Sequence, residues 1–201
     1  MTLLSAIAFS VVAFAQTPQE IVSRMEEEMV KHENDGMVMT VDVKVPILGT
    51  MTTRVYTLND KTRVDGELMG VKIINWDDGT TEWMYDSKKN EVEIKKLDPT
   101  KTEESDAEMF DGITDGYTVS LQKETADAWY FTCKKTKDNK DKDAPKTMDL
   151  VVSKGTYYPI SLKAKMSGVT MTLHDISFGV TEKQVTFDPK DYPTATIVDK
   201  R

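Results

Sequence analysis

The sequence predicts a mainly β protein built on an antiparallel sheet, with a single N-terminal helix. Three observations support this class. Apolar and polar residues alternate along most of the chain, which is typical of strands with one buried face. Short clusters of Gly, Asn and Asp separate these stretches, as in tight hairpin turns. One stretch near the N-terminus instead repeats its apolar residues with helical spacing.

Residues 1–15 have the pattern of a secretory signal peptide, and residues 16–201 are expected to form one domain. The apolar run in the first segment is shorter than the roughly 20 residues that a membrane-spanning helix needs. Ala13-Phe14-Ala15 matches the small-x-small rule for cleavage before Gln16. We therefore expect an exported, periplasmic protein that is soluble after cleavage.

The expected helix begins directly after this segment. Thr17 is suited to the N-cap, Pro18 to the first helical position, and Glu20 to completing a capping box. The apolar stripe that follows consists of Ile21, Val22, Met25 and Met29. Gly36 can adopt the left-handed backbone that often ends a helix, so we expect the helix to end near it. Its apolar stripe must pack on the sheet.

The alternating stretches give about ten strands, all with one apolar and one polar face. The expected strands lie, in chain order, within 37–45, 51–58, 62–68, 71–97 (three short strands), 117–121, 129–133, 148–152, 160–166 and 169–173. One helix of about four turns cannot cover the apolar face of so many strands. The sheet must therefore curl around its apolar face or fold onto itself. From the residues alone, an open half-barrel with the helix at its mouth and a β-sandwich are equally compatible.

Residues 71–97 also carry a family resemblance. Asp78-Gly79-Thr80 followed by Trp83-Met84-Tyr85-Asp86 resembles the D-G-x-x-x-W-x-Y hairpin of the LolA/LolB-like carriers of outer-membrane lipoproteins. Val185-Thr186-Phe187-Asp188-Pro189 and the later Ile197-Val198-Asp199 resemble the closing segment of that family. The resemblance implies a strongly curved antiparallel sheet, an open half-barrel around an apolar cavity. It therefore favours the half-barrel over the sandwich.

The resemblance further implies a lid over the concave face. Residues 98–111 interrupt the strand rhythm, and residues 105–110 could form a short helix there. In this region and directly after it, Met109, Phe110 and Ile113 are the side chains that could face a cavity.

The chain departs from the family at one marked position. The family has an Arg-Pro pair in the early sheet, whose arginine helps to hold the lid closed, and this pair is absent here. Arg54 and Arg63 are the candidates to replace it. The mismatch favours a general lipid- or amphiphile-binding role over the transfer of lipoproteins alone.

Charge and cysteine content exclude several functions. A net charge of −8 argues against nucleic acid as a partner, because binding to phosphates needs neutralising cations. It also argues against electrostatic adhesion to an anionic membrane. Cys133 is the single cysteine, so no intramolecular disulfide can form. It shares the phase of Trp129 and Phe131 along its strand, which indicates a buried, inert thiol.

Catalytic motifs are missing around the histidines as well. His32 lies at the end of the expected helix, where it could complement the helix dipole. His174 falls on the polar face of its strand, and neither histidine has a partner at triad or metal-ligand spacing. We expect a protein that is not an enzyme and that holds no cofactor and no metal ion.

The apolar face is the remaining candidate for function. The chain has 12 methionines, and several of them fall on the face expected to point inwards. Methionine is flexible and polarisable, so such a wall can repack around acyl chains of variable shape. The predicted cavity wall consists of Met37, Met39, Val41, Val43, Met148, Leu150, Leu162, Met166, Met171 and Leu173.

Two functions are consistent with this wall. The first is a periplasmic carrier that holds lipid or lipoprotein acyl chains in the concavity and ferries them toward the outer membrane. The second is a non-transporting interaction or sensor module of the envelope, with the same scaffold and a filled core. The expected partners are acyl chains or a lipoprotein, together with membrane proteins of the envelope, and we expect a monomer.

Overall fold

The structure of the protein is a computed structural model that describes residues 16–47, 49–97, 110, 112–166 and 168–201. The expected signal peptide (1–15), the predicted lid residue Met109 and most of the expected lid helix lie outside the described residues. Within the described ranges, no helix is both long enough and apolar enough to cross a bilayer.

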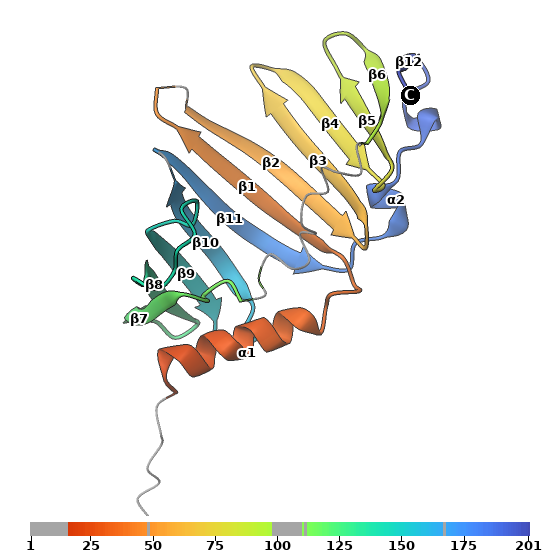
Figure 1. Ribbon diagram of the computed structural model, residues 1–201. Coiled ribbons are helices and arrows are strands. Elements are labelled where there is room, and N and C mark those ends of the chain that lie inside the picture. Colours follow the sequence, from red (N-terminus) through yellow and green to blue (C-terminus); the bar gives the residue numbers. More distant parts are fainter. Residues whose placement is uncertain (1–15, 48, 98–109, 111, 167) are drawn as a thin grey trace, which may run out of the picture.

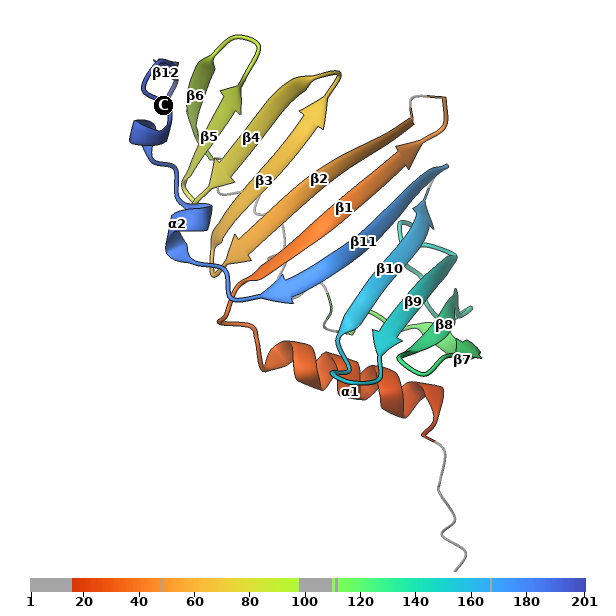
Figure 2. The ribbon, with the colours of Figure 1, turned by 180° about the vertical axis from the view of Figure 1, so that it is seen from behind.

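Twelve strands form one curved sheet that does not close (Figures 1 and 2). Their order across the sheet is β12-β6-β5-β4-β3-β2-β1-β11-β10-β9-β8-β7, so β12 and β7 are its edges. The strands are β1 (Met37–Val45), β2 (Gly49–Leu58), β3 (Lys61–Leu68), β4 (Val71–Asp77), β5 (Thr81–Asp86), β6 (Glu91–Lys96), β7 (Tyr117–Glu124), β8 (Ala128–Lys135), β9 (Thr147–Ser153), β10 (Pro159–Met166), β11 (Val169–Phe178) and β12 (Thr196–Asp199). The predicted open, curved sheet with one N-terminal helix is therefore confirmed.

The strand count exceeds the expected number because the C-terminus returns to the sheet. β12 pairs in parallel with β6, and each of the other neighbouring strands is antiparallel. A parallel pair needs a long connection, and here nearly the whole second half of the chain separates the two strands. No local turn signal could have predicted this pairing.

Helix α1 (Pro18–Val30) begins as its sequence predicts. The Thr17 hydroxyl accepts a hydrogen bond from the Glu20 backbone N–H (3.2 Å), and the Glu20 carboxylate accepts one from the Thr17 N–H (2.7 Å). The helix ends at Val30, earlier than expected, and turns lead to Gly36. Gly36 has φ +66°, and a Cβ there would lie 2.6 Å from the Thr57 carbonyl oxygen. Glycine at this position therefore lets the connection pass close to β2.

The sheet is buried on opposite faces in its two halves. Met37 and Met39 of β1 belong to a core with α1, while Val38 between them packs with Val180 and Val185. Because successive side chains of a strand point to opposite faces, these two cores lie on opposite sides of the sheet.

The second core extends along β3–β6 under the C-terminal segment. Antiparallel partners share a face, and Val38, Tyr56, Arg63 and Trp76 are paired in succession, so Trp76 lies on the Val38 side. Trp76 is buried and makes ring contacts with Phe187 and Tyr192. This segment also contains helix α2 (Glu182–Val185) and the 3₁₀ turn η3 (Pro189–Asp191).

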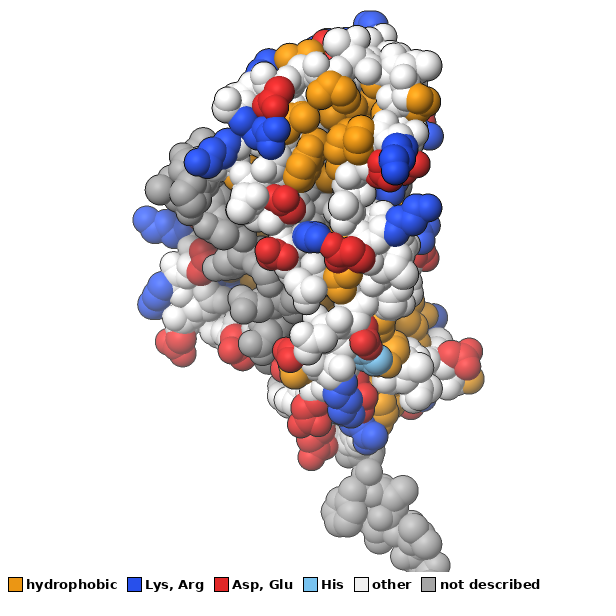
Figure 3. All heavy atoms as spheres, turned by 90° about the vertical axis from the view of Figure 1, so that its right-hand side faces the viewer, with side chains coloured by type: hydrophobic (Ala, Val, Ile, Leu, Met, Phe, Trp, Pro, Cys, Tyr) orange, Lys and Arg blue, Asp and Glu red, His pale blue; other side chains and the backbone are white. Residues whose placement is uncertain are grey.

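The view from the β12 edge shows how this half ends. Hydrophobic side chains gather in the upper part of that view, and charged side chains surround them (Figure 3). Ile197 of β12 is one of the exposed large hydrophobic residues of the protein. On the strand next to it, Glu93 forms one ion pair with Lys95 of the same strand and another with Lys200, and the second pair fastens the C-terminus to β6.

Candidate apolar binding face

The strand register brings the predicted wall residues onto one face. Met51, Val43, Met171, Ala164 and Met148 are successive partners across β2, β1, β11, β10 and β9. The neighbouring row contains Val41, Leu173, Leu162 and Leu150 on four of the same strands. Partners in an antiparallel sheet share a face, so these rows form a continuous apolar surface. It lies on the α1 side of the sheet, together with Met37 and Met39.

Most of this face is packed rather than open. Six of the ten predicted wall residues are buried in one core with the α1 residues Ile21, Val22, Met25 and Met29. These six are Met37, Met39, Met148, Leu150, Leu162 and Leu173. Helix α1 therefore packs on the part of the apolar face that these six residues form, which we call the lower part.

The remaining part of the face, which we call the upper part, extends past the helix. Val41, Val43 and Met171 are half-buried. Met166, which the alternation placed on the inner wall, is 36% exposed at the end of β10. Its position beside the turn after β10 explains the exposure, because fewer strands continue beyond it. Met51 lies in the same row as Val43 and is 40% exposed.

Sequence reasoning assigned no face to Met51. Met51 and Val55 alternate with polar residues, which indicates that both point to the apolar face. Threonines occupy positions on both faces of this strand, however, and obscure the alternation. Ile160 shows the opposite problem: it alternates in phase with Leu162, which is typical of a buried position, and yet it is exposed. A register irregularity between Pro159 and Ser161 changes the phase there.

Two of the predicted lid residues can be placed. Phe110 is 1% exposed and belongs to the core under α1, and Ile113 is half-buried against that core. Both side chains thus pack into the core on the α1 side of the sheet.

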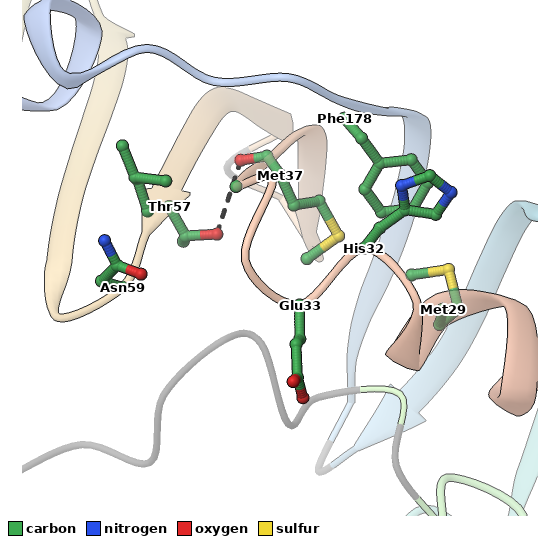
Figure 4. A pocket seen from close by; sticks show the side chains of 9 residues that line it. Met29, His32, Glu33, Met37, Thr57, Asn59 and Phe178 are labelled. Carbon is green, nitrogen blue, oxygen red and sulfur yellow. Dashed lines mark hydrogen bonds between the residues drawn. The ribbon is translucent and has the colours of Figure 1, made fainter.

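A small pocket lies where α1 ends. It is lined by residues of the α1–β1 connection, β2 and β11, including Met29, Met37, Thr57 and Phe178 (Figure 4). Its volume of about 20 Å³ is room for about one water. It is too small for an acyl chain.

His32 lines this pocket, two residues beyond the end of α1, and makes structural contacts there. Its ring stacks on Phe178 with 4.3 Å between ring centres. Its Nδ1 lies 2.6 Å from the Asp35 carboxylate, and its Nε2 lies 2.5 Å from the Tyr158 hydroxyl. The side chain therefore ties the end of α1 to β11 and to the residue before β10.

The other candidate reactive groups are held in structural contacts. Cys133 is fully buried, and burial raises the pKa of its thiol to about 11, which keeps it protonated. His174 lies between Asp42 (3.1 Å) and Asp175 (3.0 Å) on the face away from α1. Among the described residues, no group of three or more His, Cys, Asp or Glu side chains could hold a metal ion.

The side chain of Arg63 makes its contacts within the second core. Its guanidinium forks onto the Asp65 carboxylate at 2.6 and 2.8 Å and lies over the rings of Tyr56 and Trp76. It also donates to the Gln184 carbonyl, 3.4 Å away. Arg63 therefore supports the C-terminal segment, on the side of the sheet opposite to α1.

Comparison with known proteins shows similarity of fold, without a sequence match to a known family. No family model matches the chain, and no curated protein matches its sequence. The chain is similar to lipoprotein LppX from Mycobacterium tuberculosis, with a TM-score of 0.52, 11% identity and coverage of 82% of this chain and 98% of that one. At this identity the likeness shows a shared fold.

Two further solved structures align with lower scores. An uncharacterised conserved protein from Thermus thermophilus has a TM-score of 0.48 and 19% identity, covering 92% of this chain and 100% of that one. A LolA superfamily protein from Nitrosomonas europaea has a TM-score of 0.35 and 14% identity, covering 87% and 99%. At the level of the fold the chain is thus similar to LppX, and its hairpin and closing motifs resemble those of the LolA/LolB-like family.

Proposed function

We propose that the protein binds acyl chains of a lipid or lipoprotein on the upper part of its apolar face and carries them in the cell envelope. The observation that supports this most is the continuation of the apolar face past α1. Val41, Val43 and Met171 are half-buried there, and Met51 and Met166 are exposed. Apolar surface of this kind is stabilised when an acyl chain covers it, by roughly 25 cal/mol for each Å².

The packed lower part supports a second candidate. Met25 of α1, Met39 of β1 and Leu150 of β9 are almost fully buried in one cluster, as in a solid core. A filled interior suits a non-transporting interaction or sensor module of the envelope. The two candidates differ in whether the upper part of the face takes up a ligand.

Ligand content of the purified protein tests the proposal directly. We expect mass spectrometry of an organic extract, from protein purified without detergent, to detect an acyl-containing compound in a defined ratio to protein. A neutral environment-sensitive fluorophore should bind the extracted protein saturably, and a fatty acid should displace it. A protein that carries no lipid and binds the fluorophore only at millimolar concentration would support the filled module instead.

Paired variants locate the binding surface. Met171→Gln should weaken fluorophore binding by about tenfold, because its amide would lack a hydrogen-bond partner beside the ligand. Lys165→Gln, on the solvent face of the neighbouring strand, is the control and should bind as the parent does. Equal losses in both variants would place the binding elsewhere.

Export is the remaining part of the proposal. Protein recovered from the envelope fraction should begin at Gln16, with residues 1–15 removed. Its intact mass measures this, and a mass that includes Met1 would contradict export by cleavage.

A further inference from the structure

A polar hollow lies on the face of the sheet that points away from α1. It crosses β2, β1, β11 and β10, which lie side by side in the sheet (Figure 2). Its volume of about 250 Å³ is room for several waters or for a small ligand. The lining residues are Asp42, Lys44, Thr50, Lys163, Thr170 and Thr172. Along β1, Asp42 and Lys44 alternate with Val41 and Val43, so the hollow and the apolar face lie on opposite sides of the sheet.

The strand register places one lysine on each side of β11. Lys44 of β1 is paired with Thr170, and Lys163 of β10 is paired with Thr172. Two strand spacings of about 4.8 Å each separate the backbones that carry the lysines. A lysine stem is long and flexible, so both ammonium groups can reach one anion above the two threonines. The hollow therefore offers two positive charges to a single ligand.

The hydrogen-bond donors of the hollow have no internal partners. Among the described residues, neither lysine forms an ion pair. The hydroxyls of Thr50, Thr170 and Thr172 likewise make no hydrogen bond within the part of the chain that the structure describes. Two ammonium groups and three hydroxyls thus remain for a ligand, and this donor set favours an anion with several oxygens.

Asp42 sets a condition on the charge of that anion. The Thr52 hydroxyl donates a hydrogen bond to its carboxylate (2.6 Å), and His174 Nε2 lies 3.1 Å from the same carboxylate. The hydrogen bond from Thr52, above all, lowers the pKa of Asp42, so this group is charged at neutral pH. The lining then carries two positive charges and one negative charge. A ligand has to engage both lysines to outweigh the repulsion from Asp42, which favours a dianion over a monoanion.

We propose that the hollow binds the phosphate group of a small soluble phosphate monoester. Such a group carries close to two negative charges and three strong acceptor oxygens, which match the two lysines and the threonine hydroxyls. The net charge of −8 opposes approach to an anionic bilayer, so a soluble ligand is favoured over a lipid headgroup. This site does not rest on the proposed acyl binding, because it lies on the other face of the sheet.

Calorimetric titration with phenyl phosphate at pH 8 tests the site, because the probe is a dianion at that pH. We expect saturable binding to one site, which weakens as the salt concentration rises. Inorganic phosphate and sulfate should bind within about tenfold of the probe. Acetate, a monoanion, should bind at least about tenfold more weakly than sulfate.

A matched pair of lysine variants separates a built site from diffuse surface charge. Lys163→Gln should weaken binding of the probe by about tenfold, and Lys44→Gln should do the same. Lys165 lies on the same face of β10, is also exposed and does not line the hollow. Lys165→Gln removes the same charge and should weaken binding by less than about twofold at physiological salt.

Variants at the uncharged and acidic positions test the roles of the other lining groups. Thr172→Val keeps the branched shape, removes the hydroxyl and should weaken binding by about threefold. Thr147→Val, at an exposed position on β9, is its control and should bind as the parent does. Asp42→Asn removes the repelling charge and should tighten binding by about threefold.

Three results would overturn the proposal. They are the absence of saturable binding of phenyl phosphate and sulfate, equal losses in the Lys163 and Lys165 variants, and binding of a phosphate monoester only when a lipid presents it on a vesicle. An unchanged Tm in the lysine variants shows that a loss of binding is not a loss of fold. The fluorophore assay on the same variants should be unchanged, so failure of this site and failure of acyl binding can be told apart.

Discussion

The two halves of the sheet are buried by different chemistry on opposite faces. The half around β7–β11 packs mostly aliphatic and methionine side chains against α1, with Phe110 and Phe131 among them, and β1 shares in this core through Met37 and Met39. The half around β3–β6 packs Trp76 and Trp83 against Phe187 and Tyr192 of the C-terminal segment. Methionine repacks easily whereas contacting aromatic rings hold defined positions, so the comparison separates an adaptable half from a rigid one.

The largest effect is expected from the rigid half. Trp76 is 3% exposed, contacts two rings and lies under the Arg63 guanidinium. Trp76→Ala should lower the free energy of unfolding by about 3–5 kcal/mol, because it leaves a large cavity under the C-terminal segment. Urea denaturation measures this. Trp83→Ala, at a half-buried position, should cost less, and equal losses would mean that the aromatic core is loosely packed.

Two variants in the adaptable half separate the effect of side-chain volume from that of side-chain shape. Met25 is fully buried between α1 and the sheet. Met25→Ala should lower the free energy of unfolding by about 2–5 kcal/mol, whereas Met25→Leu should cost less than about 1.5 kcal/mol. The same denaturation experiment measures both. A large loss in the leucine variant would show that this half is as exacting in shape as the aromatic one.

The smallest effect concerns the fastening of β12. Hydrogen bonds from Lys200 and Lys95 lower the pKa of Glu93 to about 2, from an ordinary value of 4.5. A carboxyl with a lowered folded pKa stabilises the fold fully above pH 4.5, and this contribution is lost as the pH falls toward 2. The protection factors of the β12 amides, which correct hydrogen exchange for its intrinsic pH dependence, should therefore fall in this pH range. Glu93→Gln is the matched variant, and its protection factors should already be low at pH 6 and should change little on acidification. An identical pH response in both proteins would assign the loosening to other carboxyl groups.

Most of the fold could be predicted because its signals are local. The alternation in 37–45 and 148–152, the capping residues Thr17 and Glu20, and the turn at Gly79 each depend on a few neighbouring residues. The candidate face was predicted less well. The strand register brings the residues of this face together. How deeply each of them is buried depends on how far α1 extends over the face. The alternation of residues around Met166 contains no information about the extent of α1.

Local patterns in the sequence specify the class of the protein, its strands and the helix that must cover an apolar face, because period and turn chemistry act over short distances. Which face is buried in each half depends instead on the tertiary structure. In β4 both Ile73 and Ile74 are apolar, so alternation could not choose between the faces. The choice is made by the C-terminal segment, which returns to the sheet about a hundred residues later and buries Ile74 and Trp76. Such a contact depends on chain topology, which local patterns do not encode.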